Sequence, residues 1–361
     1  MRTIAVLNQK GGVGKTTTVV NTAAALAAMG SRVLVIDLDP QAHLTIHLGL
    51  EPRTIRAGSY RVLTQSSKIA AEILLARLNL WLLPANIDLV GAETELVSVV
   101  GRETILREAL ENVQDNFDYC FIDCPPSLGL LTLNALAAAQ KVLIPLQPHF
   151  LALQGFGKLL QTVDLVNRRI NPALKVEGIL LCMFDSRASL PGEVKANIKQ
   201  FLNNARGTNC AWAGATILPT SIRTNIKLAE APSYGKTIFE YEPNCHGAQD
   251  YTQVAKFIAR QNASAPSAAP AAPPDTPQPH LPDQPAPTLQ EPHPPQSATA
   301  SRPATRITAI PGPEPPNGPQ PDASENKHDH NIPIKAVKPP DKTPPPRQAN
   351  QPAPAGPDNP P

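Results

Sequence analysis

The chain has 361 residues, of which 42% are hydrophobic, and its formal net charge is only +2. A charge so close to neutral does not by itself indicate a nucleic-acid partner, and no apolar stretch approaches the ~20 residues that a membrane-spanning helix needs. The five cysteines form no Cys-x-x-Cys pair, so the sequence offers no metal or redox motif of that kind. Residues 1–8 have the pattern of a strand and not of a secretory leader, so we expect a cytoplasmic protein.

Composition divides the chain into two parts. Residues 263–361 hold 30 of the 42 prolines and no aromatic residue, so this stretch cannot bury enough apolar surface to offset its loss of conformational entropy. We expect a disordered proline-rich tail, which acts either as a flexible solubilising extension or as a ligand for proline-binding modules. Residues 1–262 have the size of one α/β domain, with 25 Lys and Arg against 21 Asp and Glu.

The first predicted strand, Ile4–Leu7, leads into a glycine-rich loop and then into a predicted helix from Thr16 to Met29. Glycines allow backbone N–H groups to turn inward around a phosphate, and the helix presents its positive end to the same anion. This context predicts a loop that binds a nucleoside triphosphate with Mg²⁺, in which Lys15 reaches the β- and γ-phosphates and Thr16 ligates the metal. The residues expected to bind the nucleotide are Lys10, Gly11, Gly12, Val13, Gly14, Lys15, Thr16 and Thr17.

The loop contains a second lysine that the general phosphate-binding motif lacks. That motif has glycine five residues before Gly14, where this chain has Gln9 followed by Lys10. Two lysines carry more positive charge than the β/γ end of one triphosphate usually requires. Lys10 is therefore either a solvated residue at the strand end or a second phosphate contact.

The second predicted strand, Val33–Asp37, ends at a pair of acidic residues, Asp37 and Asp39. Phosphoryl transfer to water needs an oriented nucleophile and a cation that neutralises charge. Asp39 is therefore a candidate for catalysis and for the metal site. For Asp37 two roles remain open, which are support of the Mg²⁺ shell or of the loop geometry, and capping of the next turn or helix.

Further apolar runs at Leu80–Leu83, Tyr119–Asp123, Val142–Pro145 and Val176–Met183 predict four more buried strands. Helical stretches are expected near 102–113, 152–170, 191–204 and 247–260. This alternation predicts a P-loop NTPase fold of the α/β class, a doubly wound and mostly parallel sheet flanked by helices. Ligands of such sheets bind outside the carboxyl ends of the strands.

The predicted strand Tyr119–Asp123 ends in an aspartate that is followed by Pro125 and Pro126. A carboxylate in this position usually holds Mg²⁺ through water. The two prolines stiffen a segment that could sense the γ-phosphate. Thr16, Asp39 and Asp123 are therefore the candidate Mg²⁺-binding residues.

Four motifs together resemble one known family. They are KGGVGKTTT at 10–18, DLDPQ at 37–41, DCPPSLGLLTLNALAA at 123–138 and LAEAPSYGKTI at 228–238. They look like those of the chromosomal ParA/Soj partition ATPases, which carry the deviant Walker A loop of the ParA/MinD superfamily. The likeness covers about residues 1–260.

The resemblance implies a slow, partner-stimulated ATP hydrolase that needs ATP and Mg²⁺. ATP would close two subunits into a sandwich homodimer, in which Lys10 of one subunit contacts the phosphates bound by the other, with Lys15 acting beside it. Asp39 would position or activate the attacking water. The dimer would bind DNA without sequence preference, as a nucleoid-associated protein, and a ParB/Spo0J-like partner would stimulate hydrolysis and release it.

Sequence-independent DNA binding requires lysines and arginines aimed at phosphates. The resemblance places such contacts partly in residues 185–188 and 222–227, where the candidates are Arg187, Arg223 and Lys227. The family often has Pro-Arg where this chain has Arg223-Thr224, so the basic residue is displaced by one position and a proline that would line the nucleotide is missing. The residues that contact adenine are left unassigned.

Two other kinds of protein with the same core remain alternatives. A MinD-like membrane ATPase would carry a C-terminal amphipathic helix, which the proline-rich end of this chain cannot form, so we expect no membrane partner. A ParA-like ATPase that positions a protein cargo would have the same ATPase core. A neighbouring ParB-like gene would favour DNA partition over cargo positioning.

Overall fold

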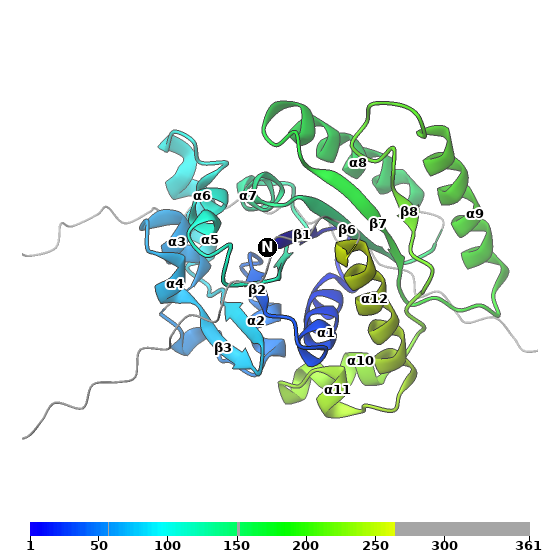
Figure 1. Cartoon of the computed structure of the whole chain (residues 1–361), viewed down its shortest axis with the longest axis horizontal. Helices are drawn as coiled ribbons and strands as arrows, with labels where there is room; N and C mark the ends of the chain where they lie inside the picture. Colours follow the sequence, from blue (N-terminus) through cyan, green and yellow to red (C-terminus); the bar gives the residue numbers. More distant parts are fainter. Residues whose placement is uncertain (57, 150–151, 264–361) are drawn as a thin grey trace, which may run out of the picture. The chain divides into compact units, whose positions relative to one another are not determined.

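The computed structural model describes residues 1–56, 58–149 and 152–263, which Figure 1 draws in colour. The predicted tail lies outside this part of the chain, apart from Ala263, which ends helix α12 (His246–Ala263). The proposed boundary between residues 262 and 263 therefore stays a prediction.

An eight-stranded sheet forms the centre of the described part, in the order β3-β4-β2-β5-β1-β6-β7-β8. All neighbouring strands are parallel except β3 and β4, which pair antiparallel at one edge. This confirms the predicted α/β fold with a mostly parallel sheet. The strands are β1 Arg2–Val6, β2 Val33–Asp37, β3 Leu74–Arg77, β4 Leu80–Leu83, β5 Tyr119–Asp123, β6 Lys141–Leu146, β7 Lys175–Leu181 and β8 Thr216–Ile217.

Helices connect the strands and continue after the last one. The α-helices before α12 are α1 Lys15–Ala28, α2 His43–His47, α3 Ser59–Thr64, α4 Ile69–Glu72, α5 Leu89–Glu95, α6 Ile105–Glu111, α7 Leu130–Ala138, α8 Ala152–Arg169, α9 Ser189–Asn204, α10 Lys227–Glu230 and α11 Ile238–Tyr241. Short 3₁₀ turns occur at η1 Pro52–Thr54, η2 Leu96–Ser98 and η3 Ala231–Tyr234.

Both faces of the sheet are covered, because successive residues of a strand point to opposite sides. Ile4 and Val6 of β1 belong to a core layer that includes α1 and α12. Ala5 belongs to the other layer, which includes α7 and α8. Figure 1 shows these two helix layers on opposite sides of the strands. Burial on both sides explains why the strand sequences are unbroken apolar runs.

The six predicted strands are confirmed, and two short strands were missed. β2, β4 and β5 have their predicted bounds, and β1, β6 and β7 differ at their ends by one or two residues. The missed β3 is a partly exposed edge strand, and the missed β8 has only two residues. Neither strand carries the buried apolar run on which the prediction depended.

The order β2-β5-β1 brings three strand ends together at one place. Asp37 at the end of β2 is the register partner of Asp123 at the end of β5. Asp123 is also the register partner of Val6 at the end of β1. The loop that follows β1 therefore emerges beside both carboxylates, at the carboxyl edge of the sheet, where open α/β sheets bind their ligands.

Candidate active site

The loop between β1 and α1 needs its glycines. Gly12 and Gly14 have φ values of 72° and 91°, in the left-handed region that residues with a Cβ atom rarely adopt. Gly14 is also the residue from which α1 begins, and the first N–H groups of a helix have no partner within the helix. The loop and the helix start together have the geometry of an anion-binding site.

The first two residues of α1 provide a lysine and a hydroxyl beside the buried carboxylates. The Thr16 hydroxyl donates a hydrogen bond of 2.7 Å to Oδ2 of Asp123. Lys15 is only 7% exposed, and its ammonium donates to the main-chain oxygen of Lys10 at 3.4 Å. A phosphate group could replace this long contact without drawing the lysine out of the loop.

Asp37 and Asp123 are both buried at the strand ends. Burial raises the pKa of Asp37 to about 7. Burial, with a smaller contribution from neighbouring Asp37, also raises the pKa of Asp123 well above its usual range. A cation near Asp123 would therefore stabilise this edge of the sheet by favouring the charged carboxylate.

The carboxylate of Asp37 organises the loop that follows β2. It accepts hydrogen bonds from the main-chain N–H of Asp39 at 3.1 Å and from the N–H and hydroxyl of Thr45 at 2.9 and 2.7 Å. Asp37 does not line the pocket described below. Of the roles left open, the contacts favour support of the loop geometry together with capping of the first turn of α2, to which Thr45 belongs.

Asp39 reaches the pocket that Asp37 does not reach. It is 8% exposed, and its Oδ1 accepts a hydrogen bond of 2.9 Å from the main-chain N–H of Gln41. The carboxylate is thus fixed at a pocket wall. A carboxylate held in this way can accept a hydrogen bond or a proton from a water molecule in the pocket.

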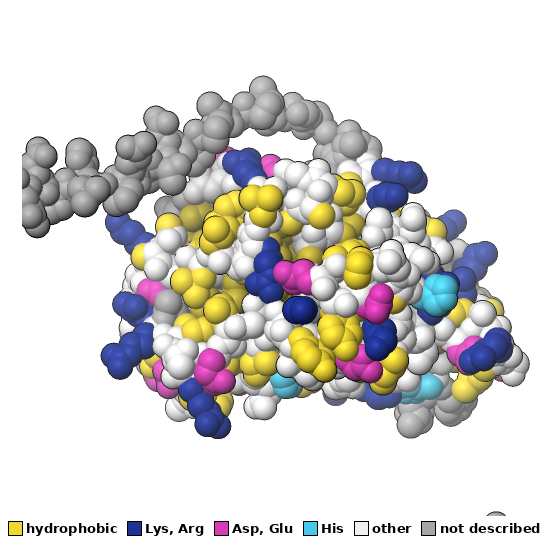
Figure 2. Space-filling view, turned by 90° about the horizontal axis from the view of Figure 1, so that it is seen from below, with side chains coloured by type: hydrophobic (Ala, Val, Ile, Leu, Met, Phe, Trp, Pro, Cys, Tyr) yellow, Lys and Arg dark blue, Asp and Glu magenta, His cyan; other side chains and the backbone are white. Residues whose placement is uncertain are grey.

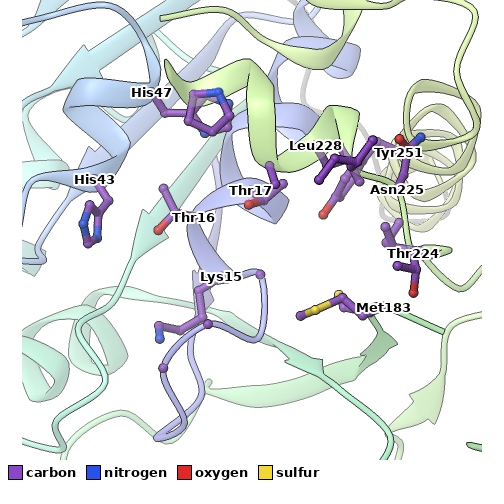
Figure 3. Close-up of a pocket in the computed structure, with 18 of the residues that line it drawn as sticks. Lys15, Thr16, Thr17, His43, His47, Met183, Thr224, Asn225, Leu228 and Tyr251 are labelled. Atoms are coloured by element: carbon purple, nitrogen blue, oxygen red, sulfur yellow. The ribbon is translucent and has the colours of Figure 1, made fainter. Parts of the chain in front are cut away.

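A pocket of about 720 Å³ opens beside the loop (Figure 3). A volume of this size suits a nucleotide-sized ligand. Val13 is buried and Lys10 is exposed, and neither lines the pocket. The other residues predicted to bind the nucleotide do line it: Gly11, Gly12, Gly14, Lys15, Thr16 and Thr17.

Much of the remaining wall was not assigned from the sequence. Figure 3 shows a group of side chains on the side away from Lys15, and two histidines of α2 on the opposite side. These residues come from the segment after β7, from α10 and the residues before it, and from α12 and α2, so no local pattern connects them with the phosphate loop. The group consists of Met183, Thr224, Asn225, Leu228 and Tyr251, and the histidines are His43 and His47.

Lys10 lies at the exposed rim of the loop. Its main-chain N–H donates to Oδ1 of Asn8 at 3.0 Å, and its ammonium contacts Nε2 of His149. Partial burial and the nearby Lys10 charge lower the pKa of His149. The Lys10 side chain is therefore directed to the loop surface and not into the pocket.

The residues beside the loop fit a Mg²⁺ ion. Thr16 and Asp123 supply oxygen ligands of the kind this ion prefers, and Oδ1 of Asp123 is buried without a hydrogen-bond partner among the described residues. No group of three or more His, Cys, Asp or Glu side chains in the described segments could hold a metal by itself. Phosphate oxygens and water would therefore supply the other ligands.

Two of the predicted DNA-contacting residues, the exposed Arg187 and the half-buried Lys227, are each paired with a carboxylate. The Arg187 guanidinium lies 3.0 Å from Asp185, and the Lys227 ammonium lies 2.9 Å from Glu230. Figure 2 views the molecule from the side of α10 and α11, and there basic and acidic side chains lie next to one another. Positive charge on this face is thus largely balanced locally.

Arg223, the third predicted DNA contact, is held more firmly. Its guanidinium lies 2.6 Å from the buried Asp250, and its main-chain N–H donates to the same carboxylate at 3.0 Å. Arg223 also lines the nucleotide-sized pocket. These contacts place Arg223 in the wall of that pocket, where it also satisfies a buried charge.

Comparisons with known sequences identify relatives of this chain. Residues 1–176 match the family model described as AAA domain. The chain is 44% identical over 257 residues to the sporulation initiation inhibitor protein Soj of Bacillus subtilis, which covers 71% of this chain and 97% of that protein. It is 42% identical over 262 residues to the chromosome partitioning protein ParA of Myxococcus xanthus, which covers 72% and 89%.

Solved structures share the fold. A cobyrinic acid a,c-diamide synthase from Mycobacterium smegmatis with bound ATP analog and magnesium has a TM-score of 0.63 and 37% identity, covering 73% of this chain and 96% of that chain. The septum site-determining protein MinD of Pyrococcus horikoshii, complexed with Mg-ADP, has a TM-score of 0.56 at 22% identity, covering 72% and 96%, and supports the fold alone. On its sequence identity to Soj and ParA over nearly their whole lengths, the chain belongs to the ParA/Soj family of chromosome-partitioning ATPases.

Proposed function

We propose that this protein closes into an ATP-bound homodimer, binds DNA without sequence preference in that form, and hydrolyses ATP when a ParB/Spo0J-like partner stimulates it. Membership of a family of partitioning ATPases supports the ATP chemistry and the role in partition. The dimer, the DNA contact and the stimulating partner are the parts that the proposal adds.

The observation that carries the proposal is the position of Lys10. One lysine of the loop, Lys15, is nearly buried in the pocket wall. The other, Lys10, is exposed and does not line the pocket of its own subunit. An exposed ammonium at the rim of a phosphate site is well placed to reach phosphates that a second subunit binds against the same edge.

Within one subunit each polar residue has a separate task. Lys15 binds the β- and γ-phosphates, and Asp39 accepts a hydrogen bond from the attacking water. Thr16 and Asp123 would hold Mg²⁺, which neutralises charge on the transferred phosphoryl group when bound. Asp37 holds the Asp39 loop and the start of α2 in place through its hydrogen bonds.

The experiment that tests the proposal is sedimentation of the protein with nonspecific duplex DNA in ATP, in ADP or without nucleotide. We expect binding with ATP only, and a fall in affinity of several orders of magnitude between about 50 and 200 mM salt if six or more phosphates are contacted. Equal binding in all three nucleotide states, or none, would contradict the proposal.

Two further arms separate the alternatives. No helix in the described segments is long and apolar enough to cross a membrane. ATP-dependent binding to anionic liposomes and not to DNA would indicate a MinD-like ATPase. ATP-dependent DNA binding without stimulation of hydrolysis by a ParB-like protein would favour a cargo-positioning ATPase.

A further inference from the structure

A second pocket, rich in arginine, lies at the same carboxyl edge of the sheet. Its volume is about 250 Å³, and its lining comes from η1 and the residues after it, from α3, and from the residues that follow β4. Because β4 runs parallel to β2, this pocket and the phosphate loop open at the same edge. Three arginines line the pocket: Arg53, Arg56 and Arg61.

Two of these arginines are free to bind an anion. Arg53 and Arg56 are exposed, and neither forms an ion pair with any residue in the described ranges. Arg61 is bound to the buried carboxylate of Glu72 at 3.3 Å. Asp88 is the acidic residue of the lining, so the pocket keeps an excess of positive charge that comes from Arg53 and Arg56.

The residues around the pocket are held by hydrogen bonds. The side-chain amide of Asn86 donates to the main-chain oxygen of Ile55 at 3.3 Å and to Oδ2 of Asp88 at 3.0 Å. Both of its hydrogens are then used, and its Oδ1 is buried without a partner among the described residues. The turn that carries Arg53 and Arg56 is thereby connected to the carboxyl end of β4.

A further contact links this pocket to the nucleotide site. The Ser59 hydroxyl at the start of α3 donates to the main-chain oxygen of Asp37 at 2.6 Å, and the Ser59 N–H donates to the main-chain oxygen of Pro84 at 2.8 Å. Asp37 is the residue whose carboxylate orders the Asp39 loop. Helix α3, which supplies Tyr60 and Arg61 to the arginine pocket, is thus joined to the strand end from which the Asp39 loop begins.

We infer that Arg53 and Arg56 contact backbone phosphates of duplex DNA in the ATP-bound protein. The inference rests on the proposed function and names a surface for it. A guanidinium presents N–H groups in a fork that matches phosphate oxygens. Arg53 and Arg56 need not give up a carboxylate to make this contact, whereas the candidates Arg187, Arg223 and Lys227 must each do so.

The test compares the salt dependence of DNA binding for the wild type and the double variant Arg53→Ala/Arg56→Ala. The probe is a nonspecific duplex with a slowly hydrolysed ATP analogue and Mg²⁺. Each lost phosphate contact lowers the slope of log K against log salt by about 0.9, so we expect the double variant to lose about two units of slope and roughly tenfold in affinity. Unchanged slope and affinity would overturn the inference.

Matched variants separate a phosphate contact from other effects. Arg53→Lys/Arg56→Lys keeps both charges and should retain most of the slope. Lys141→Ala/Lys175→Ala removes two charges from the start of β6 and β7, at the opposite edge of the sheet, and should leave the slope unchanged. Equal losses in the two alanine double variants would show a general effect of net charge and would overturn the inference.

Other occupants of the pocket give different results. Protection of Arg53 and Arg56 from an arginine-modifying reagent can be compared for the two ligands. If inorganic phosphate at millimolar concentration protects them while DNA does not, the pocket binds a free anion and the inference is wrong. Loss of ATP-dependent dimerisation in Arg53→Ala/Arg56→Ala would assign the pocket to a second copy of the chain. If wild-type protein with ATP binds no DNA at all, the proposed function fails as well, whereas equal binding by wild type and variant overturns only the inference.

Discussion

The carboxyl edge of the sheet and the surface around α10 differ in how their charged side chains are buried and paired. At the edge, Asp123 is buried, and one of its oxygens has no hydrogen-bond partner in the described part of the chain, although Thr16 binds the other. On the surface, Arg187 is exposed and Lys227 is half-buried, and each is already paired with a nearby carboxylate. A buried carboxyl group with an unpartnered oxygen and a raised pKa indicates a ligand site, whereas a paired surface charge does not by itself indicate a partner.

The largest expected effect concerns Asp39, the carboxylate that the edge presents to the pocket. We expect Asp39→Ala to bind ATP with little change and to lose about 10²-fold or more in stimulated hydrolysis, because the attacking water loses its acceptor. Nucleotide binding is measured by equilibrium titration and turnover by phosphate release. A variant with wild-type turnover would show that the buried edge is not the catalytic region.

Lys15→Ala is the matched control for that measurement. Lys15 lines the same pocket, but its role is to hold the phosphates, so the variant should lose binding of the nucleotide and not only hydrolysis. Similar behaviour of the two variants would mean that Asp39 also acts in binding.

The pH dependence of stability tests whether His47 is buried as a neutral ring beside the carboxyl edge of the sheet. Burial lowers its pKa to about 4 from an ordinary value of 6.5. As the pH falls from 6.5 to 4 the unfolded chain takes up this proton first, so the folded protein loses up to about 3 kcal/mol of stability from His47. Asp37, with a pKa raised to about 7, acts with the opposite sign in this range.

The measurement is therefore the difference between wild type and His47→Gln in urea unfolding across this pH range. The variant cannot take up the proton, so it should become relatively more stable as the pH falls. Parallel curves for the two proteins would contradict the burial of His47 as a neutral ring.

Arg223→Ala and Arg187→Ala compare an ion pair to a buried carboxylate with an exposed ion pair. The substitution leaves the buried Asp250 without its guanidinium, and we expect a loss of about 1–2 kcal/mol in the free energy of unfolding. Arg187→Ala breaks only an exposed pair and should leave stability unchanged. If both variants have wild-type stability and nucleotide affinity, and Arg223→Ala alone weakens DNA binding, then Arg223 is a DNA contact and not a wall of the pocket.

Much of the fold and the centre of the site could be predicted because their signals are local. Apolar runs predict strands that are buried on both faces, and glycines at required left-handed positions predict the phosphate loop. Asp37 and Asp123 meet because each ends its strand, and parallel strands end at one edge. The site could therefore be predicted from the residues that end the strands.

The remaining parts depend on contacts between distant segments. Tyr251 and Leu228 line the pocket only because α12 and α10 return to the phosphate loop, and no nearby pattern indicates this. The sequence also does not tell which arginines are paired. Arg223 is neutralised by a carboxylate 27 residues away, whereas Arg56 has no such partner among the described residues.

The central claim, that Lys10 acts on the nucleotide of the neighbouring subunit, is tested most directly by mixing two inactive variants. Lys10→Ala keeps Asp39, and Asp39→Ala keeps Lys10, so a mixed dimer contains one complete site only if Lys10 acts on the nucleotide of the neighbouring subunit. If Lys10 acts across the dimer, the mixture should recover up to roughly a quarter of wild-type stimulated hydrolysis, since about half of the dimers are mixed and each has one whole site. If Lys10 acts in its own subunit, every site lacks one residue, and hydrolysis no faster than that of the separate variants would contradict the claim.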